Sequence, residues 1–183
     1  RKEDDQLMSD HELANVRTQM GMVFQSFNLW PHFTVLQNVI EAPVHVLGVS
    51  KDDAVLSAEQ LLEKVGLKAK RDAYPYSLSG GQKQRFSVAT TLVNDPLVLF
   101  LDEPTTGLDP QARRHMWELI KAFKGQGKTV LLTTHYMEEA ERLCDELIVI
   151  DEGSLLAQGS PAELIRQHCE SDVLEIRGAV SEI

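Results

Sequence analysis

The feature that most constrains the fold is a series of short apolar runs separated by segments with helical periodicity. The runs are LVLFL at residues 97–101, TVLLT at residues 129–133 and LIVID at residues 147–151. Helices are predicted between them, over residues 110–123 and 136–143, and before them from about Gly81. Apolar strands that alternate with helices are typical of a largely parallel sheet covered by helices. The sequence therefore predicts an α/β fold for this part of the chain.

The first part of the chain is predicted to be mainly helical. Residues 34–70 are interpreted as all helix, with Thr34 as a cap at the start and Gly66 as the stop. A strand is predicted at residues 20–24, after a short helix at about residues 10–18. At the other end we expect a turn and short strand between Gly153 and Gly159, a helix starting at Ser160 and Pro161, and a last strand at residues 173–177.

Composition excludes several classes of protein. The 183 residues are enough for one sizeable core, and the net charge of -10 argues against a general affinity for nucleic acid, which needs clustered Lys and Arg. The longest apolar runs are far below the ~20 residues that span a bilayer. Cys144 and Cys169 are interpreted as reduced thiols, with Cys144 in the core. The start at Arg1, with no methionine and no leader, is interpreted as a start inside a domain.

Two carboxylates follow the apolar run at residues 98–101, where a buried parallel strand is predicted to end. Ligands bind at that edge of open α/β sheets. Asp102 suits a magnesium ion that bridges phosphate oxygens, and Glu103 suits a general base that polarises an attacking water. The alternative is that the two acids only cap the turn before Pro104. The neighbouring motifs decide between these interpretations.

The string LSGGQ at residues 78–82 lies just before a predicted helix. Consecutive glycines let backbone N–H groups approach a phosphate, and the helix dipole adds positive partial charge. Read alone, SGG is equally an ordinary loop. Here it is followed in order by the two carboxylates, by TTGLDP at residues 105–110 and by TTH at residues 133–135. That ordered set favours a nucleotide site.

With these motifs in this order, the chain resembles the ATP-binding subunits of ATP-binding-cassette (ABC) transporters over about residues 16–167. The resemblance implies a P-loop NTPase-like, largely parallel sheet with flanking helices plus an all-helical subdomain at about residues 34–95. The remainder would form the catalytic α/β core of a partial nucleotide-binding domain spanning residues 1–183. It also implies ATP and Mg²⁺ as ligands.

The resemblance assigns a role to each matching residue. Gln25 matches the glutamine that reaches the magnesium and the attacking water. Asp102 matches the metal-holding aspartate, Glu103 the catalytic glutamate, and His135 the histidine that contacts the γ-phosphate. Asp109 matches an aspartate at the dimer contact. The signature loop, which closes on a nucleotide held by the opposite subunit, corresponds to Ser79, Gly80, Gly81 and Gln82.

The phosphate-binding string GxxxxGK[ST] does not occur in these 183 residues. The nearest string is GQGKT at residues 125–129, but it joins a helix to a strand, which is the wrong order. We predict a turn there. We further expect the chain to be a portion of a domain that lacks the lysine loop, and to bind ATP weakly or not at all when isolated.

The two halves resemble different transporters. Residues 21–76 resemble importers of polar amino acids, whereas the sequence from about Leu78 resembles exporters of drugs or polysaccharides. A natural mosaic, a divergent branch and an artificial join all remain open, with a slight preference for coupling to an importer.

The leading hypothesis is an ATPase subunit of a membrane transporter that dimerises around ATP. Its expected partners are transmembrane permease subunits and a second nucleotide-binding domain, with no nucleic acid, and its expected location is peripheral, on the cytoplasmic face of the membrane. The alternatives are a soluble ABC ATPase acting on DNA or ribosomes and a truncated, non-catalytic interaction module.

Overall fold

The computed structural model describes residues 9, 13, 16–24 and 27–168. The predicted strand at residues 173–177, Cys169, Gln25 and most of the predicted helix at residues 10–18 lie outside these residues. The chain divides into two compact units, residues 1–135 and residues 136–183, and each is described by itself.

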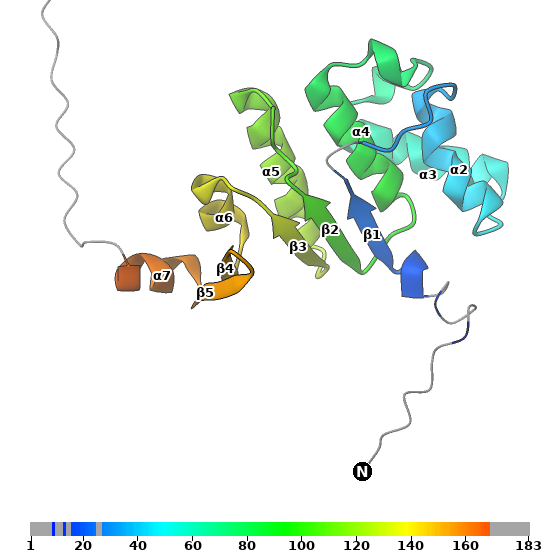
Figure 1. Cartoon of the computed structure of the whole chain (residues 1–183). Helices are drawn as coiled ribbons and strands as arrows, with labels where there is room; N and C mark the ends of the chain where they lie inside the picture. Colours follow the sequence, from blue (N-terminus) through cyan, green and yellow to red (C-terminus); the bar gives the residue numbers. More distant parts are fainter. Residues whose placement is uncertain (1–8, 10–12, 14–15, 25–26, 169–183) are drawn as a thin grey trace, which may run out of the picture. The chain divides into compact units, whose positions relative to one another are not determined.

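The first unit contains a parallel sheet of three strands in the order β1-β2-β3 (Figure 1). The strands are β1 (Met20–Val23), β2 (Val98–Asp102) and β3 (Thr129–Thr133). Both pairings are parallel, and one row of the register joins Met22, Phe100 and Leu131. The predicted α/β fold with a parallel sheet is confirmed, and the limits of β3 are those predicted from the sequence.

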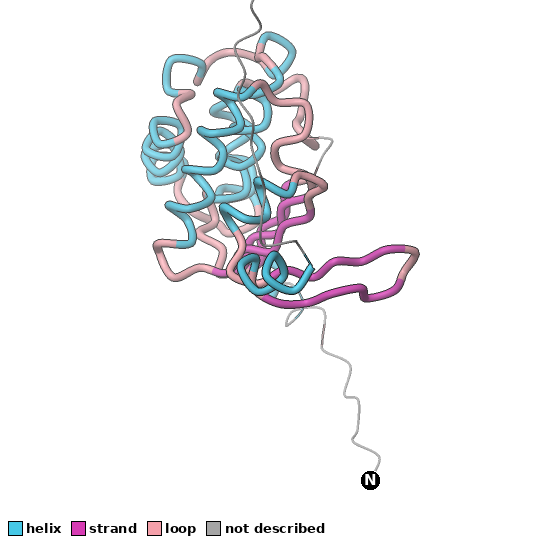
Figure 2. The backbone as a smooth tube through the Cα atoms, turned by 90° about the vertical axis from the view of Figure 1, so that its left-hand side faces the viewer, coloured by secondary structure: helices cyan, strands magenta, loops and turns pink. Residues whose placement is uncertain are grey.

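The two faces of this sheet differ in burial. On one face Val23, Leu99 and Leu101 are 0–2% exposed. Gly21 lies on the same face, where a Cβ atom would collide with Thr91 of the helix that packs there. On the other face Met22 and Leu131 are 50% and 55% exposed. In Figure 2 the helices of this unit lie to one side of its strands.

In the described part of this unit, the helices that accompany the sheet include α2 (Val35–His45), α3 (Lys51–Lys64), α4 (Gly80–Leu92) and α5 (Pro110–Lys124), with short 3₁₀ turns at Lys68–Lys70 and Pro75–Ser77. Buried apolar side chains of α2, α3 and α4 form one hydrophobic cluster that includes Val39, Leu62 and Phe86. This cluster is the core of the helical part of the unit.

The prediction of all helix over residues 34–70 holds for α2 and α3 but not for the residues that join them. The chain leaves helical structure between α2 and α3, where Gly48 has φ of +68° and Ser50 caps the next helix through Asp53 N. The predicted cap at Thr34 is confirmed: its Oγ1 accepts from Gln37 N, and its N–H donates to Gln37 Oε1. Gly66 ends α3 with φ of +69°, as predicted.

The second unit comprises α6 (Met137–Leu143), β4 (Leu147–Asp151), β5 (Ser154–Gly159) and α7 (Pro161–His168). The apolar run at residues 147–151 was expected to extend the parallel sheet, but β4 pairs with β5 as an antiparallel hairpin. Glu152 and Gly153 both have positive φ, +47° and +75°, which is the backbone of a tight two-residue hairpin turn.

Two smaller expectations concern Cys144 and the membrane. Cys144 takes part in no disulfide among the described residues and is half-buried, so it is less enclosed than a core residue. Within the described part of the chain, we find no helix with the length and apolar character that a membrane span requires.

Candidate functional site

Asp102 and Glu103 lie where β2 ends, at the carboxyl edge of the parallel sheet. Asp102 is the last residue of β2, and Glu103 follows with φ of +45°. A positive φ costs a non-glycine residue conformational energy, and such strain in proteins concentrates at functional sites. The turn therefore presents the Glu103 carboxylate at the edge where α/β sheets bind ligands.

Thr133, the last residue of β3, fixes both acidic residues. Its hydroxyl donates to Asp102 Oδ1 over 2.6 Å, across the register pair that joins the two residues. The N–H of Glu103 donates to both the carbonyl oxygen and the Oγ1 of Thr133, at 3.1 and 3.2 Å. These bonds hold the strained turn in one geometry.

The Glu103 carboxylate is held at both oxygens. Thr106 Oγ1 donates to its Oε2 over 3.0 Å, and His135 Nδ1 lies 3.4 Å from its Oε1. Glu103 is about one third exposed and His135 about half exposed (32% and 54%), so both can meet a ligand from solvent. The structure thus brings together Asp102, Glu103 and His135, three of the residues that the sequence analysis assigned to a nucleotide site.

The oxygen donors at this edge fit a magnesium ion. Mg²⁺ in phosphate-binding sites is usually held by one or two carboxylates together with phosphate oxygens and water. Asp102 keeps one carboxylate oxygen beyond the one that Thr133 engages. Within the described residues no group of three or more acidic, histidine or cysteine side chains could hold a metal ion without further ligands.

The signature string forms the start of α4. Ser79 is the N-cap: its Oγ accepts from Gln82 N at 3.3 Å, and its N–H donates to Gln82 Oε1 at 2.9 Å. Ser79 and Gln82 thus close a reciprocal capping box. The backbone N–H groups of the first turn are left at the positive end of the helix dipole, a position suited to an anion.

The two glycines of this string have different surroundings. A Cβ atom on Gly80 would meet no described atom within 4 Å. A Cβ atom on Gly81 would stand 3.0 Å from the Cβ of Ala112, in the first turn of α5. Gly80 therefore leaves an open approach to the backbone, whereas Gly81 permits close packing of α4 on α5.

Asp109 is the N-cap of α5. Its Oδ1 accepts from Gln111 N at 3.0 Å and Ala112 N at 2.9 Å. The bond from Ala112 is the main cause that lowers the pKa of Asp109, with smaller contributions from Gln111 and from the charge of Arg114. The resemblance predicts a dimer contact for this residue, and the structure gives its side chain a capping role within the chain.

The structure thus gathers the predicted residues into two groups. The first contains Asp102, Glu103 and His135, at the ends of β2 and β3. The second contains the residues of the signature string and, through Ala112, the cap residue Asp109. Gln25 lies outside the described residues.

Two residues that bond to the first group were not predicted: Thr106 and Thr133. Both lie in strings that the sequence analysis used, TTGLDP and TTH. The available signal was a hydroxyl residue at the end of the strand next to β2. Only the register between the strands shows that this hydroxyl lies opposite Asp102.

The GQGKT string is a turn, as predicted. Gly125 ends α5, and Gly127 has φ of +78°. The ammonium of Lys128 bonds to Asp95 and, at 3.0 Å, to the carbonyl oxygen of Pro96, and it lies 5.3 Å from the centre of the Phe123 ring. This lysine is tied to the protein itself.

Comparison with known proteins gives consistent matches. The sequence model of the ABC transporter family matches residues 2–106, more than half of the chain. The Nod factor export ATP-binding protein I of Burkholderia lata is 50% identical over 164 residues, which cover 90% of this chain and 54% of that protein. The protein of the same name from Cupriavidus metallidurans is 47% identical over 162 residues, or 88% of this chain and 53% of that protein. The chain thus spans about half the length of these curated relatives.

Two solved structures share the fold. The structure of cbiO1 from Clostridium perfringens, described as part of the ABC transporter complex cbiONQ, superposes with a TM-score of 0.77 at 31% identity, covering 87% of this chain and 64% of that one. A dimeric ATP-binding cassette in a post-hydrolysis state, bound to ADP and Pi, gives a TM-score of 0.74 at 30% identity, covering 84% of this chain and 68% of that one. Taken with the motifs and their geometry, these matches show that the chain belongs to the ABC transporter family, as part of an ATP-binding domain.

Proposed function

We propose that the complete protein hydrolyses ATP as the nucleotide-binding subunit of a membrane transporter. The observation that carries this proposal is the arrangement at the ends of β2 and β3. There a strained glutamate, held at its backbone by Thr133 and at its carboxylate by Thr106, lies beside His135. A carboxylate with a fixed orientation, one residue from a second carboxylate, suits the activation of water beside a phosphate-bound magnesium.

Each residue has a distinct task in this proposal. Bound Mg²⁺ would withdraw charge from the phosphate oxygens. Asp102 would hold it, with Thr133 fixing one carboxylate oxygen so that the other faces the ligand. Glu103 would accept the proton of the attacking water. His135 would donate a hydrogen bond to the terminal phosphate.

The signature string serves a second nucleotide. The start of α4 offers a phosphate backbone N–H groups and an open approach at Gly80. Its capping box consists of Ser79 and Gln82 and includes none of the acidic residues that we assign to hydrolysis. We infer that it faces a nucleotide held by another subunit, so that two copies, or this chain and a related one, close around ATP. The similar structure described as a dimer bound to ADP and Pi supports this arrangement.

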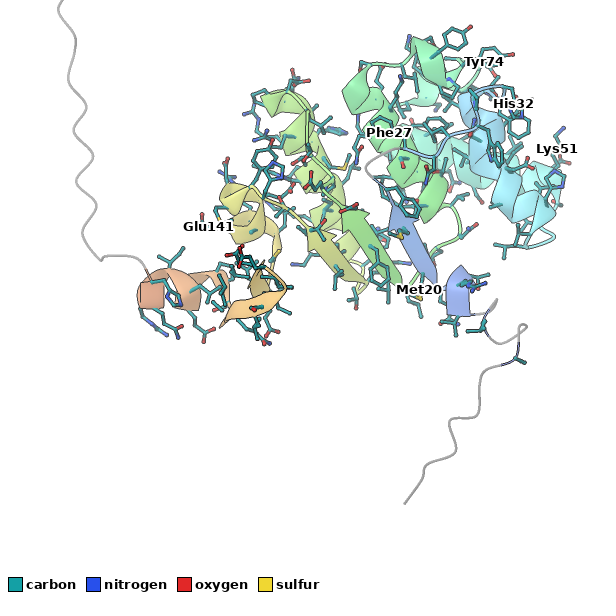
Figure 3. The ribbon with its side chains drawn as sticks, in the orientation of Figure 1. Met20, Phe27, His32, Lys51, Tyr74 and Glu141 are labelled. Carbon is teal, nitrogen blue, oxygen red and sulfur yellow. The ribbon has the colours of Figure 1, made fainter. Side chains whose placement is uncertain are left out.

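An open groove of about 320 Å³ provides a candidate contact for a permease subunit. It lies between the loop at residues 28–30 and α2, where its lining includes Trp30, Asn38 and Val46. Trp30 and Val46 are 56% and 74% exposed. Figure 3 marks His32 on the same loop, whose ring packs 4.4 Å from that of Phe33. We propose that a helical segment of a permease docks here, which would keep the protein peripheral on the cytoplasmic side of the membrane.

The names of the relatives favour an exporter. The matches to Nod factor export proteins extend over 88–90% of the chain and therefore include most of both halves. Transport of amino acids, which the first half suggested, gains no support from them. We propose an exporter subunit. The expectation that these 183 residues alone bind Mg-ATP weakly stays a prediction, which isothermal titration would test; micromolar affinity would refute it.

The test of hydrolysis compares two glutamate variants of the complete protein. Glu103→Gln removes the proposed base, whereas Glu152→Gln makes the same change at another exposed glutamate with positive φ, in the β4–β5 turn. We expect Glu103→Gln to abolish steady-state release of phosphate and Glu152→Gln to retain it. Undiminished hydrolysis by Glu103→Gln would exclude Glu103 as the base.

A further inference from the structure

Arg85 of α4 joins two elements of the first unit. Its Nη1 donates to the carbonyl oxygen of Val65 over 3.0 Å, and its Nε lies 3.3 Å from the carbonyl oxygen of Gly81, one turn earlier in the same helix. One guanidinium thus contacts the end of α3 and the first turn of the signature helix at the same time. Only an arginine has donors in a rigid fork that can meet two separate acceptors in this way.

The partner on α3 is a helix end with a specific geometry. Gly66 N–H donates to Glu63 O, and Leu67 N–H donates to Leu62 O, which together form a Schellman motif with Gly66 at φ of +69°. That motif does not use the carbonyl of Val65, which is one of the last carbonyls of the helix and lies at its negative end. Arg85 donates to this carbonyl.

The contact is tight and partly removed from water. A Cβ atom on Gly66 would lie 2.9 Å from Arg85 Nη1. Burial lowers the pKa of Arg85, and the charge of Asp109 opposes that effect. The guanidinium therefore packs against the end of α3 and interacts electrostatically with Asp109, the cap residue of α5.

The start of α4 is consequently fixed from two sides. On one side Gly81 packs against Ala112 at the capped start of α5. On the other side Arg85 ties the carbonyl of Gly81 to the end of α3. Leu78 of the signature string belongs to the hydrophobic cluster that α2, α3 and α4 share. A shift of this helical layer therefore reaches the string through that apolar contact and, as a second and polar link, through Arg85.

We propose that Arg85 is a positioning residue that transmits the position of the α3 end to the signature loop, Ser79 to Gly81. This inference rests on the proposed function for its consequence in hydrolysis. Arg85 is not among the residues proposed to contact phosphate. Through Arg85, the position of α3 would influence the position of the signature loop.

The first test measures the coupling in the chain without nucleotide. Gly66→Ala and Gly48→Ala both place a side chain at a φ near +68°, but only the first pushes on Arg85, since a Cβ at Gly48 meets no described atom within 4 Å. We expect Gly66→Ala to shift the ¹H–¹⁵N resonances of Gly80 and Gly81, and Gly48→Ala to leave them in place. In an Arg85→Gln background the two alanine variants should no longer differ at these amides. Equal spectra for the two variants in the wild-type background would overturn the proposal.

The second test measures hydrolysis by the complete protein. Arg85→Gln is compared with Lys64→Gln, which removes a charge from the exposed side of the same α3 end. We expect Arg85→Gln to lower kcat about three- to tenfold, the effect of one hydrogen bond of ordinary net strength, and to leave ADP affinity unchanged. Arg85→Lys should not restore kcat, because an ammonium lacks the fixed fork of separate donors with which the guanidinium meets the two carbonyls. Full rescue by lysine, or wild-type kcat in Arg85→Gln, would overturn the proposal.

The results distinguish a failure of the positioning role of Arg85 from a failure of the proposed function. If the complete protein has no ATPase activity, the proposed function fails, while the amide shifts still decide whether Arg85 links α3 to the signature loop. Normal ATPase activity with no effect of Arg85→Gln refutes the positioning role alone.

Discussion

At the scale of single residues, the glycines of the signature string show how one motif combines two requirements. Gly80 has open space where a side chain would be, and Gly81 faces Ala112 at 3.0 Å from its would-be Cβ. The first glycine leaves the backbone accessible to a ligand. The second is needed by the fold of this chain itself.

Alanine substitutions should separate these requirements. Gly81→Ala should lower the free energy of unfolding by about 1–3 kcal/mol, because a methyl group is forced into a packed contact. Gly80→Ala should have no cost, since it adds a helix-favouring residue in open space. Urea denaturation measures both. Ala112→Gly in the Gly81→Ala background should recover part of the loss, and a simple sum of the two single effects would contradict the packing account.

The sequence predicted the acidic residues of the site but not their supports. Asp102, Glu103 and His135 are recognisable because they lie in an ordered set of motifs that resembles the ABC family. Thr133 is a common strand residue, and its bond to Asp102 depends on the register of β2 against β3, which short sequence patterns do not specify. Arg85 was missed because one of its acceptors, Val65, lies at the end of another helix. Asn38 was missed because its partners are backbone groups of an irregular loop, whose conformation local patterns do not specify.

At the scale of elements, side-chain amides and carboxylates fix where helices begin. Asn38 of α2 is 7% exposed. Its Oδ1 accepts from Trp30 N at 2.8 Å, and its Nδ2 donates to the carbonyl oxygens of Trp30, Phe33 and Thr34 at 3.0–3.2 Å. One side chain thereby holds the loop before α2 and shapes the groove proposed for the permease.

Replacing Asn38 should loosen that loop. Asn38→Ala removes the side-chain partner of several part-buried backbone groups of the loop, among them Trp30 N, and we expect a loss of about 1–3 kcal/mol in unfolding free energy. Hydrogen exchange at the Trp30 amide should accelerate as well. Gln60→Ala, at an exposed amide on α3, is the matched control and should change neither quantity. Slow exchange at Trp30 in Asn38→Ala would contradict the clamp.

The cap of α5 should make stability depend on pH. The pKa of Asp109 is lowered from its ordinary value of 3.8, chiefly by the bond from Ala112 N. A lowered pKa means that the folded state favours the charged carboxylate. Its contribution is therefore present above pH 3.8 and is lost as the pH falls through the lower folded value.

Asp109→Asn removes this titration and keeps an oxygen that can accept one N–H bond. Between neutral pH and pH 3, the unfolding free energy of the wild type should fall more steeply than that of Asp109→Asn, as measured by urea denaturation at each pH. Parallel curves would show that the capping carboxylate contributes no pH dependence.

At the scale of the whole molecule, the apolar strands were easier to predict than their burial. Continuous apolar runs predicted strands covered on both faces, as parallel sheets usually are. The described residues cover only one face, and the row of Met22, Phe100 and Leu131 lies on the other. The run at residues 147–151 likewise forms a hairpin in the second unit, because its burial depends on neighbours that a local pattern does not reveal.

We infer that this chain carries parts of two different nucleotide sites, each of which a second subunit completes. Sedimentation of the complete protein carrying Glu103→Gln measures this association, because without hydrolysis the ATP-bound dimer persists. We expect the mass to double on addition of Mg-ATP. We also expect Gly80→Asp, which places a charged side chain in the open space beside the signature loop, to prevent the doubling without unfolding the chain. An unchanged mass with Mg-ATP, or doubling that persists with Gly80→Asp, would contradict the claim.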